Sequence, residues 1–185
     1  MRSVIVLLSL AGLSHTLASA ADRTAYVAQI GDANQARIVQ VASNGTASIS
    51  QSGDRNAARI EQLEGRDVTA TIRQSGDDNS GEAGQRASLA SLVIEQSGNR
   101  NAAIVDQQGT VHQAALTQQG NDNRIALSQT GADNQATLAQ NGDGNAMDVA
   151  QTGGGARLDW TQNGSNLAMS VMQSGGTPLQ IVQTR

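Results

Sequence analysis

The sequence predicts an all-β solenoid of about 15 short strands, with two strands in each 22-residue coil and amyloid-like stacking of the coils. Three observations predict it. Glutamine recurs with a period of 11 residues, an apolar residue stands two positions before nearly every one of these glutamines, and glycine follows most of them in a turn. A fixed period of this kind is the signature of an architecture in which each unit stacks on its neighbours.

The glutamine column sets the register. Between residues 29 and 183, Gln occupies fifteen positions at steps of 11, except for a step of 12 from Gln62 to Gln74 and a last step of 10. A buried amide without a partner costs about 1–3 kcal/mol, so inward amides should bond to one another from coil to coil. The predicted amide ladders contain Gln29, Gln40, Gln51, Gln62, Gln74, Gln96, Gln107, Gln118, Gln129, Gln140, Gln151, Gln162, Gln173, Asn34, Asn56, Asn79, Asn101, Asn123 and Asn145.

Apolar residues follow the same period. Alternate residues of a strand share a face, so the residues two and four positions before each Gln should point inward with it. The predicted apolar columns contain Val27, Ile38, Ile49, Ile60, Ile72, Ile94, Val105, Leu116, Leu127, Leu138, Val149, Trp160, Val171 and Ile181. The residues between them, such as Arg37, Arg59, Glu61 and Arg73, should point outward.

A short turn should follow each strand. Glycine adopts positive φ at little cost and stands two residues after the Gln at Gly31, Gly53, Gly76, Gly98, Gly109, Gly120, Gly131, Gly142, Gly153, Gly164 and Gly175. Asn follows alternate glutamines, which makes the true repeat 22 residues long. The arc from Asn79 to Gln85 carries Gly81, Ala83 and Gly84 and should be the loosest part of the stack.

Composition narrows the function classes. The chain of 185 residues is 38% hydrophobic but 1% aromatic, which suits a thin repetitive core better than a compact globule. The formal charge of −4 is scattered, so no basic patch for nucleic acid is expected. There is no Cys, and His112 shares its column with Val68 and Ala90. We expect no catalytic, cofactor or metal site and no small-molecule substrate.

Other repeat architectures fit less well. A helix would need apolar residues at i, i+3 and i+4, whereas here they recur at i and i+2. Calcium-binding β-rolls have a nine-residue period with an Asp in every turn, but the turns after Gln151 and Gln173 contain no acid. An ice-binding or carbohydrate-binding solenoid needs a flat array of like side chains, which outward residues such as Arg59, Glu61 and Asp106 do not form.

The N-terminal residues read as an export signal. Arg2 supplies a positive start, Val4–Leu10 an apolar stretch and Ala18-Ser19-Ala20 a small-residue cleavage site. We therefore predict a signal peptide over residues 1–20, a short segment over 21–24 and the repeat solenoid over 25–185. This organisation predicts a secreted protein.

The repeat unit resembles a known family. Residues 29–40, with Gln29, Gly31, Asn34, Ala36, Ile38 and Gln40, are similar to the curlin repeat of bacterial curli fibres, and the pattern returns at residues 51–62 and from Gln96, Gln118, Gln129 and Gln140. The resemblance implies an extracellular amyloid fibre on the bacterial surface, serving biofilm matrix and cell adhesion. It implies that the partners are the chain itself, a homologous curlin subunit, and an outer-membrane secretion pore with accessory factors. The arginine-ended last arc resembles the nucleator subunit more than the major subunit.

Two further expectations concern assembly. Asp54, Asp77 and Asp78 lie in turns between apolar arcs, where like charges repel across coils, and are candidate gatekeepers against premature stacking. The alternative function is a monomeric solenoid that acts as a surface adhesin or ligand-binding repeat protein. Such a protein needs capping elements, whereas the repeat runs to within a few residues of both ends of the sequence.

Overall fold

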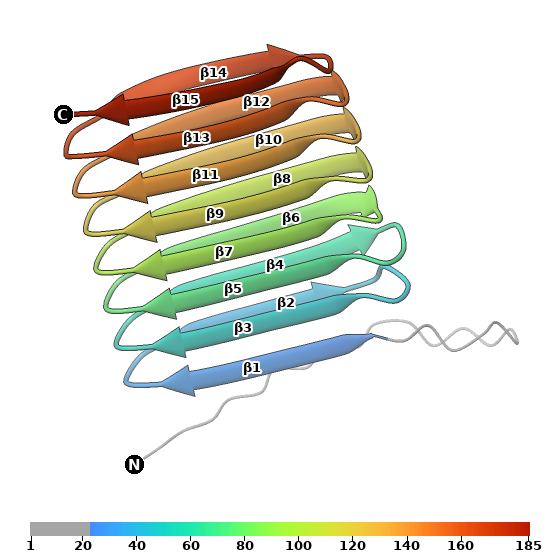
Figure 1. The fold of residues 1–185 in the computed structure, drawn as a ribbon. Coiled ribbons are helices and arrows are strands. Elements are labelled where there is room, and N and C mark those ends of the chain that lie inside the picture. Colours follow the sequence, from blue (N-terminus) through green and yellow to red (C-terminus); the bar gives the residue numbers. More distant parts are fainter. Residues whose placement is uncertain (1–22) are drawn as a thin grey trace, which may run out of the picture.

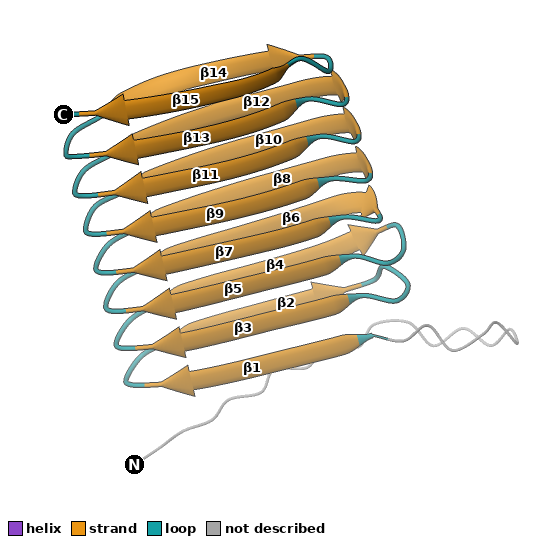
Figure 2. Ribbon diagram, viewed as in Figure 1, coloured by secondary structure: helices purple, strands orange, loops and turns teal. Residues whose placement is uncertain are grey.

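The structure, a computed structural model, describes residues 23–185. The predicted signal peptide, residues 1–20, lies outside these residues. Figure 1 shows strands that alternate between two facing sheets as the chain winds upward, and Figure 2 shows strands joined by short turns. The predicted β-solenoid is confirmed. None of the described residues belongs to a helix long and apolar enough to cross a membrane.

The strands fall into two parallel sheets. Over residues 23–185, the odd-numbered strands form an eight-stranded sheet, here called the odd sheet, and the even-numbered strands form a seven-stranded sheet, the even sheet. The strands are β1 (Thr24–Ile30), β2 (Gln35–Gln40), β3 (Thr46–Ser52), β4 (Ala57–Glu64), β5 (Thr69–Ser75), β6 (Ser80–Ser88), β7 (Ser91–Ser97), β8 (Ala102–Thr110), β9 (Gln113–Gln119), β10 (Arg124–Ala132), β11 (Gln135–Asn141), β12 (Ala146–Gly154), β13 (Arg157–Asn163), β14 (Ala168–Ser174) and β15 (Pro178–Thr184).

Equivalent residues of successive coils lie in register. In the odd sheet Val27 pairs with Ile49, and Gln29 pairs with Gln51. In the even sheet Ile38 pairs with Ile60. A one-residue slip would turn every inward side chain outward, so the apolar and glutamine columns together fix this register.

The two irregular steps of the repeat are absorbed outside the columns. The extra residue between Gln62 and Gln74 is accommodated where the pairing of β4 with β6 shifts, between Gln62 and Glu64. The shortened last step leaves Gln162 paired with Gln183. The length changes therefore lie at the end of strand β4 and in the turn between β14 and β15, while the ladders continue.

The main core is an apolar layer between the sheets, and Ala42, Val68, Ala87 and Ala90 form a smaller separate cluster. Ile49, Ile60 and Ile72 are fully buried, and Trp160 lies in the same layer. Of the residues predicted to be inside, Ile38, Ile49, Ile60, Leu116 and Leu138 are all buried. Arg37 and Arg73 are exposed, and Arg59 and Glu61 are half-buried at the surface. The inward and outward assignment is confirmed.

The arc predicted to be the loosest is paired along its whole length. Strand β6 pairs with β8 from Ser80 to Ser88. Gly81 leaves no gap, because a Cβ atom there would lie 3.0 Å from Cγ2 of Ile72. The side chain of Ile72, from the facing sheet, thus fills the space that the glycine leaves.

Candidate assembly site

The glutamines form two continuous amide ladders, one in each sheet. From Gln29 to Gln162, the Nε2 of each ladder Gln donates to the Oε1 of its equivalent in the next coil, over 2.7–3.0 Å. The second Nε2 proton reaches a carbonyl on the facing side, as from Gln51 to Gln35 over 3.0 Å. Gln85 and Gln183, which the prediction left out, also join the ladders.

The asparagines bond the turns of successive coils together. These Asn turns join each odd strand to the following even strand. The Oδ1 of Asn34 accepts the backbone N–H of Asn56 over 2.9 Å, and its Nδ2 donates to the carbonyl of Gly53 over 2.7 Å. The same pair of contacts repeats at Asn56, Asn79, Asn101, Asn123 and Asn145. The column is thus mainly a side-chain-to-backbone ladder.

Two features of the Asn turns require glycine. The backbone φ is positive there, and the backbone of the next coil lies too close to leave room for a Cβ atom. At Gly98, φ is +109°, and a Cβ atom would lie 2.0 Å from the carbonyl oxygen of Gly120. Each of Gly31, Gly53, Gly76, Gly98, Gly120 and Gly142 meets the glycine of the next coil in this way, within 2.2 Å. The coils can therefore stack at these turns only if the lower residue has no side chain.

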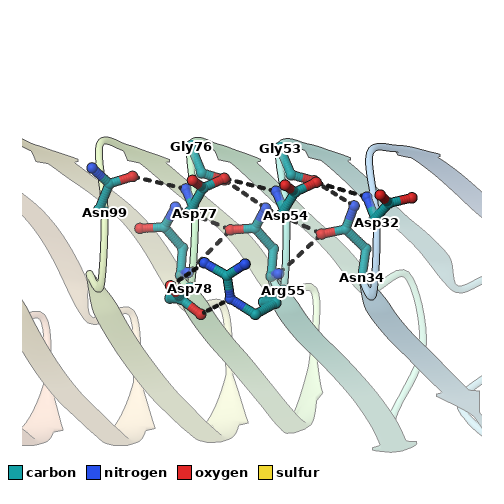
Figure 3. Close-up of polar contacts among 11 residues, drawn as sticks. Asp32, Asn34, Gly53, Asp54, Arg55, Gly76, Asp77, Asp78 and Asn99 are labelled. Atoms are coloured by element: carbon teal, nitrogen blue, oxygen red, sulfur yellow. Dashed lines mark hydrogen bonds and ion pairs between the residues drawn. The ribbon is translucent and has the colours of Figure 1, made fainter.

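Acidic and amide side chains form a further column beside the glycines. Figure 3 shows the Oδ1 of Asp54 accepting the backbone N–H of Asp32, over 2.7 Å, and the Oδ1 of Asp77 accepting that of Asp54, over 2.8 Å. Asn99 takes the same role for Asp77 over 2.9 Å. Three carboxylates therefore stack in successive coils, and an amide can replace one of them without loss of the contact.

Asp78 differs from its prediction. It does not face like charge, because Arg55 of the preceding coil binds both of its carboxylate oxygens, over 2.7 and 2.8 Å (Figure 3). Hydrogen bonding from Arg55 lowers the pKa of Asp78 below its ordinary value. Arg100 and Asp122 repeat this pair further along the stack. The predicted repulsion across coils is therefore wrong for Asp78, whereas for Asp54 and Asp77, which stack with Asp32, it stays a prediction.

A few buried polar atoms have no partner among the described residues. They include Nδ1 of His112 and Nε1 of Trp160. The Nε2 of His112 lies 2.8 Å from the carbonyl oxygen of Gln108, and its ring is fully buried in the column that also holds Val68 and Ala90. The surroundings of His112 are those of a packing residue.

Both ends of the stack present open strand edges. Among the described strands, none pairs with the outer edges of β1 and β2 at one end or of β14 and β15 at the other. Leu179 is exposed there, and Met172 is 87% exposed. Unpaired edges with apolar flanks are templates for another strand.

Some of these contacts were not predicted. The asparagine carbonyls and aspartate carboxylates accept backbone N–H groups, and residues such as Arg55 and Asp78 adopt positive φ. The spacing of Gly and Asn in each turn is the signal that could have indicated the backbone contacts. The Arg55–Asp78 pair could have been found by comparing charges one coil apart.

Comparison with known families identifies the repeat. A family model described as the curlin associated repeat matches residues 22–53, 43–76, 98–131 and 120–153, which together cover more than half of the chain. No curated protein sequence matches the chain. The interval between the two matched regions contains β6, whose inward residues include Gly81 and Ala83.

Proposed function

Because the chain belongs to the curlin associated repeat family, we propose that it is a structural subunit of extracellular amyloid fibres of the curli type. Chains would join by end-to-end stacking of their strands. The observation that supports this most directly is the direction of the amide ladders. In both sheets each bond runs from the coil nearer the N-terminus to the coil nearer the C-terminus.

This direction makes the two ends of the stack complementary. The first coil offers the Oε1 atoms of Gln29 and Gln40, which receive no ladder bond from a described residue. The last strand offers the Nε2 atom of Gln183, whose Oε1 already accepts from Gln162. A second copy placed with its first coil on this end continues the donor-to-acceptor order and pairs the open backbone edges.

Stacking also covers apolar surface. The inward residues of the terminal strands, including Val27, Met169 and Ile181, are half-buried, whereas their equivalents inside the stack are buried. Removing apolar surface from water contributes about 25 cal/mol per Å². A strand added at either end therefore gains both hydrogen bonds and hydrophobic contact.

The family indicates where the fibre forms and with which partners. We propose that the chain is exported through an outer-membrane pore with accessory factors and assembles at the bacterial surface. It would assemble with itself and with a homologous curlin subunit, in biofilm matrix and cell adhesion. The role is structural rather than enzymatic. We propose further that the chain acts as the nucleator subunit. It should then speed fibre formation by the homologous subunit at a molar ratio well below one.

Asp54 and Asp77 are proposed gatekeepers of this assembly. Their carboxylates stack with that of Asp32 at one-coil spacing, about 5 Å, well inside the Debye length of about 8–10 Å. Repulsion between them opposes closure of the coils. Asp78 is not proposed for this role, since its charge is paired with Arg55.

The proposal is tested by assembly of the purified protein. At micromolar concentration it should form fibres whose diffraction shows the cross-β spacings of about 4.8 and 10 Å. Sedimentation that finds a stable monomer over days would contradict the proposal and favour a monomeric adhesin.

A matched pair of variants tests the ladder mechanism. Gln40→Ala removes the acceptor offered by the first coil and should lengthen the lag before fibres appear. Gln113→Ala, at an exposed outward position of β9, serves as the control and should leave the lag unchanged. Equal lags for the two variants would contradict growth through the ladder.

A further inference from the structure

Resting on the fibre proposed above, we propose that successive chains are related by a half-turn about the fibre axis. The odd sheet of one chain then continues as the even sheet of the next. The ligand of each open end is a second copy of this chain, in one defined orientation.

The alternation of strands leads to this arrangement. Each strand pairs with the strand two further along the chain, so β13 pairs with β15 and β12 pairs with β14. The fifteen described strands begin and end in the odd sheet. The next vacant position of the winding is therefore on the edge of β14, in the even sheet. The β1 of a following chain fits there, and its β2 then fits on β15.

The alternative arrangement leaves a gap. If β1 of the following chain paired with β15, its β2 would lie two strand spacings above β14. One strand would then be missing from the even sheet. The backbone N–H and C=O groups on the free edge of β14, which point toward the next chain, would stay unpaired. Each unpaired buried group costs about as much as a lost hydrogen bond, so the half-turn is favoured.

The ladders permit the exchange of sheets. Both sheets carry the same inward pattern, and both ladders run in the same direction. After a half-turn, the Nε2 of Gln173 faces the Oε1 of Gln29 of the next copy, and the Nε2 of Gln183 faces the Oε1 of Gln40. In the isolated chain, Gln173 donates a hydrogen bond to the carbonyl of Thr177 in the last turn. On stacking, the same N–H would instead donate to Oε1 of Gln29 in the next copy.

The glycine columns give an independent reason. The residue directly below Gly31 of the next copy must lack a Cβ atom, as it does at every Asn turn within the chain where glycine stacks on glycine. After a half-turn, Gly175 lies below Gly31, because both stand two residues after their Gln. A Cβ at Gly175 would meet nothing within 4 Å in the isolated chain. In the alternative, the residue below would be Arg185, which carries a side chain at a position where the Asn turns within the chain have glycine.

Cysteine pairs distinguish the two arrangements, because the chain has no Cys of its own. Paired positions in adjacent parallel strands lie about 4.8 Å apart, within the Cα separation of about 4.4–6.8 Å that a disulfide allows. The half-turn places Ala28 on Met172 and Val39 on Val182. The alternative places Ala28 on Val182 and leaves Val39 two strand spacings from Met172, about 9.6 Å, which no disulfide spans. All four side chains point outward.

The experiment mixes single-cysteine variants in equal amounts, lets fibres form, oxidises them mildly and separates the dissolved chains on a non-reducing gel. Ala28→Cys with Met172→Cys, and Val39→Cys with Val182→Cys, should yield at least tenfold more dimer than the two exchanged mixtures. The double variant Ala28→Cys/Ser50→Cys, at positions paired within one chain, calibrates the oxidation, and each single variant alone measures contacts between fibres.

Dimer found mainly in the mixture of Ala28→Cys with Val182→Cys, or equal dimer in all four mixtures, would overturn the half-turn while leaving the fibre itself established. A protein that forms no fibres would overturn the proposed function and this arrangement with it.

Discussion

Replacing Gly98 by Ala should be among the most damaging single-methyl changes in the stack. At φ of +109° an alanine is strained by about 1–2 kcal/mol. Its Cβ would also lie 2.0 Å from the carbonyl oxygen of Gly120, which is backbone and cannot rotate away.

The clash forces the two coils apart at this turn. The separation costs the bond from Nδ2 of Asn101 to the carbonyl of Gly120, 2.8 Å, and the bond from the N–H of Gly120 to the carbonyl of Ser97, 3.0 Å. Each contributes about 1 kcal/mol. With the backbone strain, the expected loss is about 3–4 kcal/mol.

Two other glycines separate the contributions. Gly153 has φ of +87° but makes an ordinary contact of 3.6 Å, so Gly153→Ala should cost about 1–2 kcal/mol. The neighbouring Gly154 has neither a positive φ nor a close contact, with the carbonyl oxygen of Ala132 at 3.7 Å. Gly154→Ala should change stability by less than about 1 kcal/mol.

The assay is urea denaturation of the freshly purified soluble protein, followed by far-ultraviolet circular dichroism. The urea concentration at the unfolding midpoint should be highest for Gly154→Ala, lower for Gly153→Ala and lowest for Gly98→Ala. A Gly98→Ala midpoint no lower than that of Gly153→Ala would refute the close approach of the coils as the reason for the glycine column.

Further predictions concern charge and strain in the turns. Replacing Asp54 and Asp77 together by Asn should shorten the lag before fibres form, measured by thioflavin fluorescence at low salt; a longer lag would contradict their proposed gatekeeper role. The pKa of Asp78 is lowered by Arg55, so the stability it contributes is complete above its ordinary value of 3.8 and is lost as the pH falls through the lower, folded-state value. Acid titration of Asp78→Asn, followed by circular dichroism, should therefore show less loss of stability between about pH 5 and 2 than the parent chain. Val111 is β-branched and has φ of +55°, so Val111→Asn should raise the free energy of unfolding by about 1 kcal/mol in urea titrations; a destabilised variant would show that packing outweighs strain there.

The sheet register could be predicted because each inward position carries the same type of residue, apolar or glutamine, in nearly every coil. Gln62 and Gln74 are 12 residues apart, yet the columns continue on both sides of that step, so the extra residue must lie outside them. Packing, burial and amide pairing all depend on the same period, so one pattern in the sequence determines strands, faces and register together.

The turns could not be predicted to the same depth, because their contacts join different residue types. The carbonyl of Gly53 accepts from Asn34, and the carboxylate of Asp54 accepts from backbone, so neither contact appears as a column of identical side chains. Asp78 was misjudged for the same reason. Its charge alone suggested repulsion, and the cation that neutralises it lies in the preceding coil.

The locality of the pairing has a consequence for how the chain reaches this structure. The side-chain hydrogen bonds between coils join residues 16–23 apart, as from Gln51 to Gln35 and from Gln51 to Gln74. Parallel sheets usually fold slowly because distant segments must find each other, but here each closing loop is short and of nearly constant length. A chain that emerges in sequence from the proposed secretion pore would add one coil at a time to those already formed. At every stage the emerged part is a shorter solenoid with the same kind of growing edge, so synthesis, export and folding can share one direction along the chain.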